Sequence, residues 1–193
     1  MIRPYHAWAF VFAFASSLAL GLPGGPAAAA AAADDAEPNY TRKEDVVYGR
    51  KHGMALTMDV FTPKSGANGA GIVWMVSGGW FSAHEAINPG FIEEFLNRGY
   101  TVFAVVHGSQ PRFTIPEVVE DVNRAVRYIR YHAADFGVDP DRLGVTGGSA
   151  GGHLSLMLGT AGALGNPFAK DVVDRGSSRV QAVACFFPPT DLL

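Results

Sequence analysis

Four short apolar runs, separated by segments with a helical pattern, constrain the fold of this chain most strongly. The runs cover residues 71–76, 101–106, 143–146 and 180–187. An unbroken apolar run of this length is typical of a strand buried on both faces, as in a parallel sheet whose strands are joined by helices. The pattern therefore predicts an α/β fold: a mostly parallel sheet with helices on both of its faces.

The connecting segments support this interpretation. Residues 91–97 are expected to form a short helix, and a longer helix is predicted to begin at a capping box that runs from Thr114 to Glu117. Apolar residues then recur at helical spacing as far as Ala133, and Glu117 and Asp121 are assigned to the solvated face of this helix.

An antiparallel pair of strands is predicted ahead of the alternating region. Residues 46–48 and 56–61 have strand character, and a glycine-containing turn at residues 52–53 joins them. Because the second segment alternates apolar and polar residues, it is expected to be half-buried.

The N-terminal segment has the pattern of a secretory signal peptide, predicted for residues 1–33. Arg3 gives a weakly positive start, residues 7–20 are apolar, and an alanine-rich stretch supplies A-x-A-like cleavage sites. The apolar run is short for a membrane span, which needs about 20 residues. We therefore expect a secreted or periplasmic protein without stable membrane insertion after cleavage. An uncleaved anchor, which would make the protein a membrane-bound scaffold, is the alternative.

Composition fits one globular domain. Of the 193 residues, 48% are hydrophobic, and the formal net charge of −3 gives no electrostatic reason to expect a nucleic-acid partner. The single cysteine, Cys185, excludes a cysteine-rich zinc or disulfide framework and is expected to be a buried thiol. Residues 34–44 are predicted to be a flexible lead-in and residues 45–193 the α/β domain. No pattern indicates an oligomeric state.

The motif that indicates chemistry is Gly-Gly-Ser-Ala-Gly at residues 147–151, a G-x-S-x-G sequence between a predicted strand and a predicted helix. In that context the motif predicts a nucleophile elbow, in which Ser149 occupies a strained turn and its hydroxyl stands above the sheet edge. Glycine is needed on both sides because side chains there would collide with the neighbouring strand and helix. A glycine-rich turn with an incidental serine is the alternative.

A second glycine turn, Ser-Gly-Gly-Trp at residues 77–80, follows the first buried strand. Backbone N–H groups of Gly78 and Gly79, together with that of Ala150, are predicted to form an oxyanion hole facing Ser149. An ordinary strand-end turn is the alternative.

These motifs resemble a known family. Residues 147–154, Gly-Gly-Ser-Ala-Gly-Gly-His-Leu, resemble the nucleophile elbow of hormone-sensitive-lipase-like and feruloyl-esterase-like carboxylesterases, and residues 139–143 resemble the entry into that strand. The resemblance runs from about Val46 to the end of the chain. It implies an α/β-hydrolase fold, a Ser-His-Asp triad, hydrolysis of small-molecule esters through an acyl-enzyme, and neither a cofactor nor a metal.

Two segments depart from the family pattern. Residues 76–80 read Val-Ser-Gly-Gly-Trp where the family has His-Gly-Gly-Gly-Trp, and residues 107–111 differ from the family's Tyr-Arg-containing stretch. The first departure is expected to alter the geometry of the oxyanion hole, and the second is expected to alter the substrate pocket.

The acid and base of the triad are not assigned to residues of this chain. In this fold they follow the nucleophile in the order acid, then histidine, so we expect both beyond Leu193 and interpret the chain as C-terminally truncated. His107 is expected to line a pocket rather than act as the base. His153 is expected to pack against the sheet, and Asp191 to cap a loop.

The sequence thus favours a carboxylic ester hydrolase that acts through Ser149. A serine peptidase is the alternative among enzymes, because the same architecture serves both reactions. A catalytically inactive α/β fragment, or a binding module that kept the fold, is the alternative outside enzymes.

Overall fold

A computed structural model describes residues 37–191, so the predicted signal peptide lies outside the described residues. The strands are β1 (Tyr40–Lys51), β2 (Met54–Pro63), β3 (Gly71–Val76), β4 (Thr101–Val106), β5 (Leu143–Gly148) and β6 (Ala182–Phe186). The helices are α1 (Glu93–Asn97), α2 (Ile115–Tyr131) and α3 (Ala150–Ala161), with 3-10 turns η1 (His84–Ala86), η2 (Pro89–Phe91) and η3 (Val172–Arg175). None of the helices within the described range is long and apolar enough to cross a bilayer.

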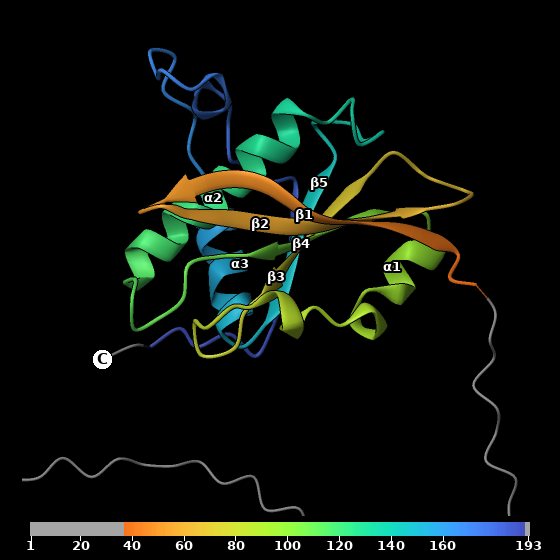
Figure 1. The fold of residues 1–193 in the computed structure, drawn as a ribbon, viewed down its shortest axis with the longest axis horizontal. Helices are drawn as coiled ribbons and strands as arrows, with labels where there is room; N and C mark the ends of the chain where they lie inside the picture. Colours follow the sequence, from red (N-terminus) through yellow and green to blue (C-terminus); the bar gives the residue numbers. More distant parts are fainter. Residues whose placement is uncertain (1–36, 192–193) are drawn as a thin grey trace, which may run out of the picture. The chain divides into compact units, whose positions relative to one another are not determined.

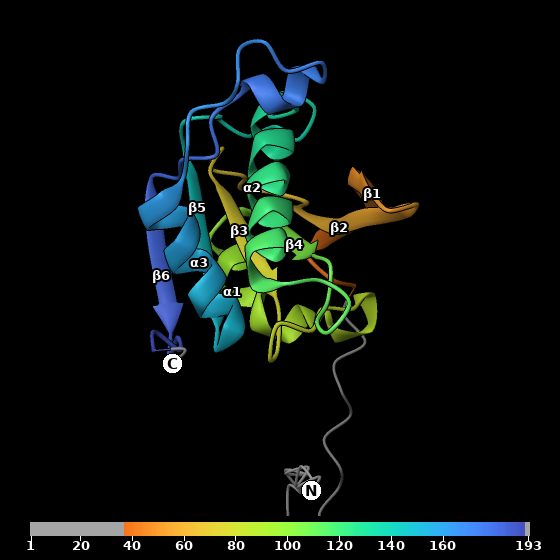
Figure 2. The ribbon, with the colours of Figure 1, turned by 90° about the vertical axis from the view of Figure 1, so that its left-hand side faces the viewer.

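The six strands form one sheet in the order β1-β2-β4-β3-β5-β6 (Figures 1 and 2). The β1–β2 and β2–β4 pairs are antiparallel, whereas β3 pairs in parallel with β4 and with β5, and β5 pairs in parallel with β6. Each parallel connection passes through a helix, as the alternation of apolar runs and helical patterns predicts. The predicted α/β class and the antiparallel pair at the start are confirmed.

Helices cover both faces of the sheet. Leu154 and Leu158 of α3 and the apolar stripe of α2 pack with Val73, Val145 and their neighbours in the larger core, on the face seen in front in Figure 2. Leu96 of α1 packs on the opposite face in a smaller core. Because both faces are covered, the side chains of β3 and β4 are mostly buried, which explains their continuous apolar sequence.

The capping box at the start of α2 is present. The Glu117 carboxylate accepts hydrogen bonds from the N–H and the hydroxyl of Thr114, both at 2.8 Å. These bonds lower the pKa of the Glu117 carboxyl, and Pro116 occupies the first turn, where its missing N–H leaves no bond unmade.

The prediction for residues 34–44 is wrong in part, because β1 begins at Tyr40. Residues 40–43 pair with residues 60–63 of β2. This stretch is polar because it belongs to an edge strand that faces solvent, where burial does not demand apolar residues. A bulge between Lys43 and Val46 follows, and β1 then continues through residues 46–48, which the sequence predicts as a strand.

The last apolar run forms a strand, but the prediction that it is buried is wrong. Within β6, four of the five residues are exposed and Cys185 is only half-buried. The strand lies at the edge of the described sheet, where β5 covers one side only (Figure 2). Apolar sequence alone does not distinguish a central strand from an edge strand that lacks a neighbour.

Candidate active site

Ser149 lies in the sharp turn between β5 and α3. Its backbone has φ +53° and ψ −125°, a region that residues other than glycine seldom adopt. The neighbouring strand holds this conformation, because the Ser149 N–H donates to the carbonyl of Phe186 at 3.0 Å. The strained turn that the motif predicts is therefore present, and it orients the serine away from the sheet.

The glycines around Ser149 are required for steric reasons. A Cβ at Gly147 would lie 2.7 Å from the backbone carbon of Gly151, and a Cβ at Gly151 would lie 2.7 Å from the carbonyl oxygen of Met75 in β3. Both obstacles are backbone atoms, which cannot move without displacing a strand or a helix. Glycine at these positions lets α3 begin directly against the sheet.

The start of α3 presents unpaired donors beside the serine. Among the described residues, the N–H groups of Ala150, Gly151 and Gly152 find no hydrogen-bond acceptor, and the first helical bond runs from the His153 N–H to the Ser149 carbonyl at 3.0 Å. The Ser149 side chain is exposed and does not cap the helix. Open N–H groups and the helix dipole both favour negative charge at this position.

The glycine turn after β3 is closed by two backbone bonds. Gly78 N–H donates to the carbonyl of Phe81, and Phe81 N–H donates to the carbonyl of Gly78, both at 2.9 Å. Gly79 and Trp80 between them have φ of +56° and +59°, as in the tight turns of hairpins. The Gly78 N–H is thus engaged inside the turn, whereas the Gly79 N–H has no acceptor in the described part of the chain.

Trp80 and His153 connect this turn to α3. The Trp80 indole N–H donates to His153 Nδ1 at 3.3 Å, and the two rings meet edge to face with centroids 5.6 Å apart. The sequence predicted that His153 packs against the sheet, and the structure instead places it against Trp80. The two residues are 73 positions apart in the chain, so no local pattern indicates the contact.

No histidine side chain in residues 37–191 forms a hydrogen bond with the Ser149 side chain. His107 lies at the end of β4, with Nδ1 2.7 Å from the carbonyl oxygen of Gly108, and its Nε2 is buried without a partner. It lines a pocket of about 370 Å³ that Ser149 does not line, in agreement with its predicted role as a pocket residue. Asp191 follows β6, and its role in capping a loop stays a prediction.

Stability should fall in mild acid because of His107. Burial lowers the pKa of His107 below its usual value of about 6.5. Between these two pKa values the unfolded chain binds more protons than the folded chain, so the free energy of unfolding decreases as pH falls below about 6.5. Urea unfolding between pH 8 and pH 5.5 should show this decrease, and a flatter profile for His107→Gln.

The His107→Gln comparison isolates one histidine, since burial lowers the pKa of His153 in the same direction in both proteins. Asp121, whose pKa burial raises, contributes with the opposite sign at lower pH. An unchanged profile in His107→Gln would contradict the prediction, because it would mean that the pKa of His107 is the same in the folded and unfolded chains.

A pocket of about 480 Å³ adjoins Ser149 on the α1 side of the sheet. Its lining is mainly apolar and includes Trp74, Phe91 and Phe186 beside the serine. Trp74 and Phe91 stack with ring centroids 6.1 Å apart and form one wall. Phe81 and Phe113 line the separate pocket beside His107.

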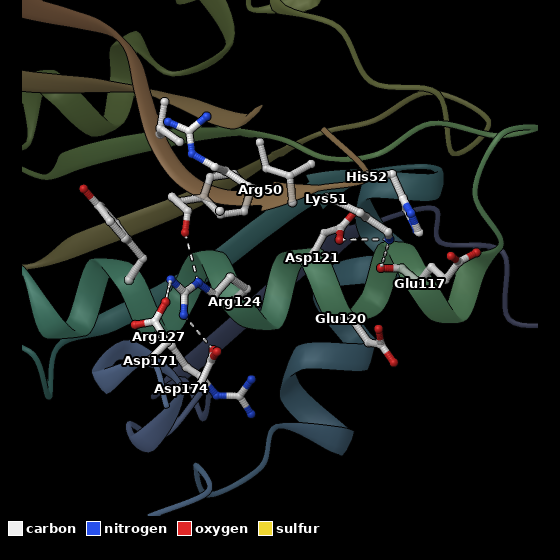
Figure 3. Close-up of a pocket in the computed structure, with 15 residues that line it drawn as sticks. Arg50, Lys51, His52, Glu117, Glu120, Asp121, Arg124, Arg127, Asp171 and Asp174 are labelled. Carbon is white, nitrogen blue, oxygen red and sulfur yellow. Dashed lines mark hydrogen bonds and ion pairs between the residues drawn. The ribbon is translucent and has the colours of Figure 1, made fainter. Parts of the chain in front are cut away.

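A groove of about 910 Å³ lies away from the serine between β1, α2 and η3 (Figure 3). Arg124 is turned toward Asp171 and Asp174, with ion-pair distances of 2.6 and 2.8 Å, and this pairing fastens η3 to α2. Lys51 reaches from β1 to Asp121 at 3.1 Å. Five of the charged side chains that line the groove are thus paired within it, which favours a structural role for these five over recognition of a charged ligand.

The prediction that Asp121 lies on the solvated face of the α2 helix is wrong, because its side chain is buried. Its carboxylate accepts hydrogen bonds from Lys51 Nζ and from the N–H of Gly108, both at 3.1 Å. Asp121 therefore ties the loop that carries His107 to α2.

One group of potential metal ligands occurs among the described residues, formed by Glu44, Asp59 and His84. The Asp59 carboxylate already accepts hydrogen bonds from Arg42 Nε at 2.7 Å and from the N–H of Asp45 at 3.0 Å. A guanidinium in the centre of the group would oppose a metal cation, so the cluster is better explained as an ion-pair network that fixes β1 to β2.

The chain is similar to known esterases in sequence and in structure. The family model BD-FAE matches residues 58–193. The probable carboxylic ester hydrolase LipM of Mycobacterium tuberculosis is 30% identical over 154 residues, which cover 77% of this chain and 35% of LipM. The apo form of Thermogutta terrifontis esterase 2 superposes with a TM-score of 0.64 at 27% identity, covering 81% of this chain and 60% of the esterase.

A third comparison supports the fold alone. The acetyl ester-xyloside bifunctional hydrolase of Caldicellulosiruptor lactoaceticus superposes with a TM-score of 0.65 at 24% identity, covering 75% of this chain and 56% of that enzyme. The chain therefore spans about a third of LipM and somewhat more than half of each of these solved hydrolases. The matches confirm the resemblance inferred from residues 147–154.

Proposed function

Because the chain belongs to the BD-FAE family of α/β-hydrolase esterases and lipases, we propose that the protein hydrolyses carboxylic esters with Ser149 as the nucleophile. The observation that carries the proposal is the backbone of Ser149, at φ +53° in the turn between β5 and α3. Such a conformation is costly for serine, by about 1–3 kcal/mol, and strain of this kind is concentrated at functional sites.

In the proposed reaction, the Ser149 Oγ attacks the ester carbonyl carbon while a histidine base takes the hydroxyl proton. The carbonyl oxygen becomes an oxyanion and accepts hydrogen bonds from the N–H groups of Ala150 and Gly79. The tetrahedral intermediate then expels the alcohol, which receives the proton from the histidine. Water attacks the resulting acyl-serine by the same route and releases the carboxylic acid.

Ala150 and Gly79 support the oxyanion hole in different ways. The Ala150 N–H is open because it belongs to the first turn of α3. The Gly79 N–H is open because the turn uses the N–H groups of Gly78 and Phe81 to close itself. Gly78, which the sequence predicts as a third donor, contributes to the proposal mainly by shaping this turn. Donors fixed before the reaction stabilise the developing charge without reorganisation.

Covalent labelling tests the proposed nucleophile. An organophosphate ester such as paraoxon should phosphorylate Ser149, because it places an electrophilic phosphorus where the ester carbonyl would lie. After proteolysis, mass spectrometry should find one diethylphosphoryl group on the peptide that contains Ser149, and none on that peptide in Ser149→Ala. Label distributed over other serines or tyrosines, with none on Ser149, would rule out an activated hydroxyl at this position.

A further inference from the structure

The turn that carries Gly79 is anchored directly after its last residue by Ser82, whose N–H donates to the Ser109 hydroxyl and whose own hydroxyl donates to the Val76 carbonyl. The two glycines have no side chains to hold them. Both Gly78 and Gly79 are exposed, and a Cβ at either would meet no atom within 4 Å. Only Trp80 has a side chain that packs against the larger core. Beyond the bonds of Ser82, the position of the Gly79 N–H relative to Ser149 depends on what fixes Trp80, the residue next to it.

Two contacts fix Trp80, one on each side of the residue. Its carbonyl accepts a hydrogen bond from the N–H of Gln110 at 3.1 Å. Its indole N–H donates to His153 Nδ1 at 3.3 Å, and the edge-to-face ring contact restricts the tilt of the indole. The backbone of Trp80 has φ +59°, which is unusual for a bulky residue, so the contacts that retain this conformation matter for the turn.

His153 is itself rigidly placed relative to the nucleophile. Its N–H donates to the carbonyl of Ser149 at 3.0 Å, so it belongs to the same helical turn as the serine. Nδ1 accepts the hydrogen bond from the Trp80 indole only when the imidazole is neutral, with its own hydrogen on Nε2. Burial lowers the pKa of His153 and favours this neutral form.

We infer that His153 is a positioning residue: through the Trp80 indole it holds the turn at residues 78–81, and hence the Gly79 N–H, at a fixed place relative to Ser149. The inference rests on the proposed function for its catalytic meaning, but the contact it describes can be measured without activity. His153 touches neither the serine hydroxyl nor the reacting atoms. It fixes the position of the Gly79 N–H relative to the Ser149 hydroxyl, and these are the two groups proposed to contact the reacting atoms.

Nuclear magnetic resonance tests the contact directly. Trp80→Phe identifies the Trp80 indole N–H resonance by its disappearance. His153→Phe keeps a planar ring and loses the acceptor, so the Trp80 indole proton should move upfield and the Gly79 amide resonance should shift with it. His153→Asn places an amide oxygen near the position of Nδ1 and should leave both resonances close to those of the parent. Unchanged indole and Gly79 resonances in a folded His153→Phe variant would overturn the inference.

Kinetics test the catalytic meaning. With p-nitrophenyl butyrate, kcat should fall about tenfold in His153→Phe and in Trp80→Phe while KM changes little, because a displaced oxyanion donor affects the transition state more than substrate binding. The double variant should be no slower than either single variant, because each substitution removes the same hydrogen bond between Trp80 and His153. His153→Asn should recover most of the rate.

Two kinetic results would contradict positioning: multiplied effects in the double variant, or a rise in KM with kcat unchanged. Hydrolysis that does not depend on Ser149 would instead count against the proposed function, and the resonance of the Trp80 indole would still decide the inference about His153.

Discussion

We expect the Ser149→Ala variant to lower kcat/KM for p-nitrophenyl butyrate by a factor of about 10⁴ to 10⁶ in the protein that carries this chain, as loss of a catalytic serine does elsewhere. The substitution removes the nucleophile and keeps the open N–H groups at the start of α3, so residual catalysis by the oxyanion hole should remain above the rate in water. Initial rates of p-nitrophenol release over a range of substrate concentrations measure the effect.

Thr160→Ala is the matched control for this experiment. Thr160 lies in α3, the helix that begins directly after Ser149. It is exposed like Ser149, and its hydroxyl donates a hydrogen bond to the Leu156 carbonyl at 2.8 Å. Its loss should leave kcat/KM within about twofold, since surface substitutions of this kind change stability by about 0.5 kcal/mol or less. Equal rates in the parent and in Ser149→Ala would assign the hydrolysis to another group and remove the basis of the proposed function.

The same assay on the 193-residue chain measures what its described residues contribute by themselves. His107 faces a different pocket, and His153 Nδ1 is bound to Trp80. If the isolated chain shows no dependence on Ser149 whereas the protein that carries it does, the base lies outside residues 37–191. Dependence on Ser149 in the isolated chain would require a histidine to approach the serine by a rearrangement of this structure.

Local pattern was sufficient to predict the parts of the fold that depend on periodicity and on glycine. Continuous apolar runs identified β3, β4 and β5, and the capping box at Thr114 identified the start of α2. The elbow is predictable because the close approach that requires its glycines occurs between residues within one five-residue motif. A Cβ at Gly147 would meet the backbone of Gly151, four positions away.

Features that depend on neighbours distant in the sequence were not predictable in this way. The start of β1 is polar because it lies at an edge, and β6 is exposed because one of its sides lacks a partner strand in the described sheet. Asp121 lies on the buried stripe of α2, three residues after Val118 and four before Ala125, although its charge favours solvent. Its partner Lys51 is 70 positions earlier and reaches it from β1, so no local pattern indicates the pair. The contact between Trp80 and His153 likewise joins two motifs that the sequence treats separately.

Gly151→Ala is expected to have the largest effect on stability of the substitutions at the elbow. The added Cβ would lie 2.7 Å from the Met75 carbonyl oxygen and 3.3 Å from the Met75 Cβ, so α3 must move away from β3. Alanine favours a helix over glycine by about 1 kcal/mol, but overpacking against a fixed backbone costs about 1–3 kcal/mol and occasionally more. Because the obstacle is a strand in the middle of the sheet, we expect the upper end of that range, with a net loss of about 2 kcal/mol.

Gly78→Ala provides the control for the Gly151 substitution. A Cβ at Gly78 would meet no atom within 4 Å, and its φ is not in the left-handed region, so the free energy of unfolding should change by about 0.5 kcal/mol or less. Urea unfolding followed by circular dichroism measures both variants. Equal stability of Gly151→Ala and the parent would mean that α3 can shift from β3 at little cost. In that case the fixed geometry between Ser149 and the oxyanion turn, which the proposed mechanism requires, would lose its structural support.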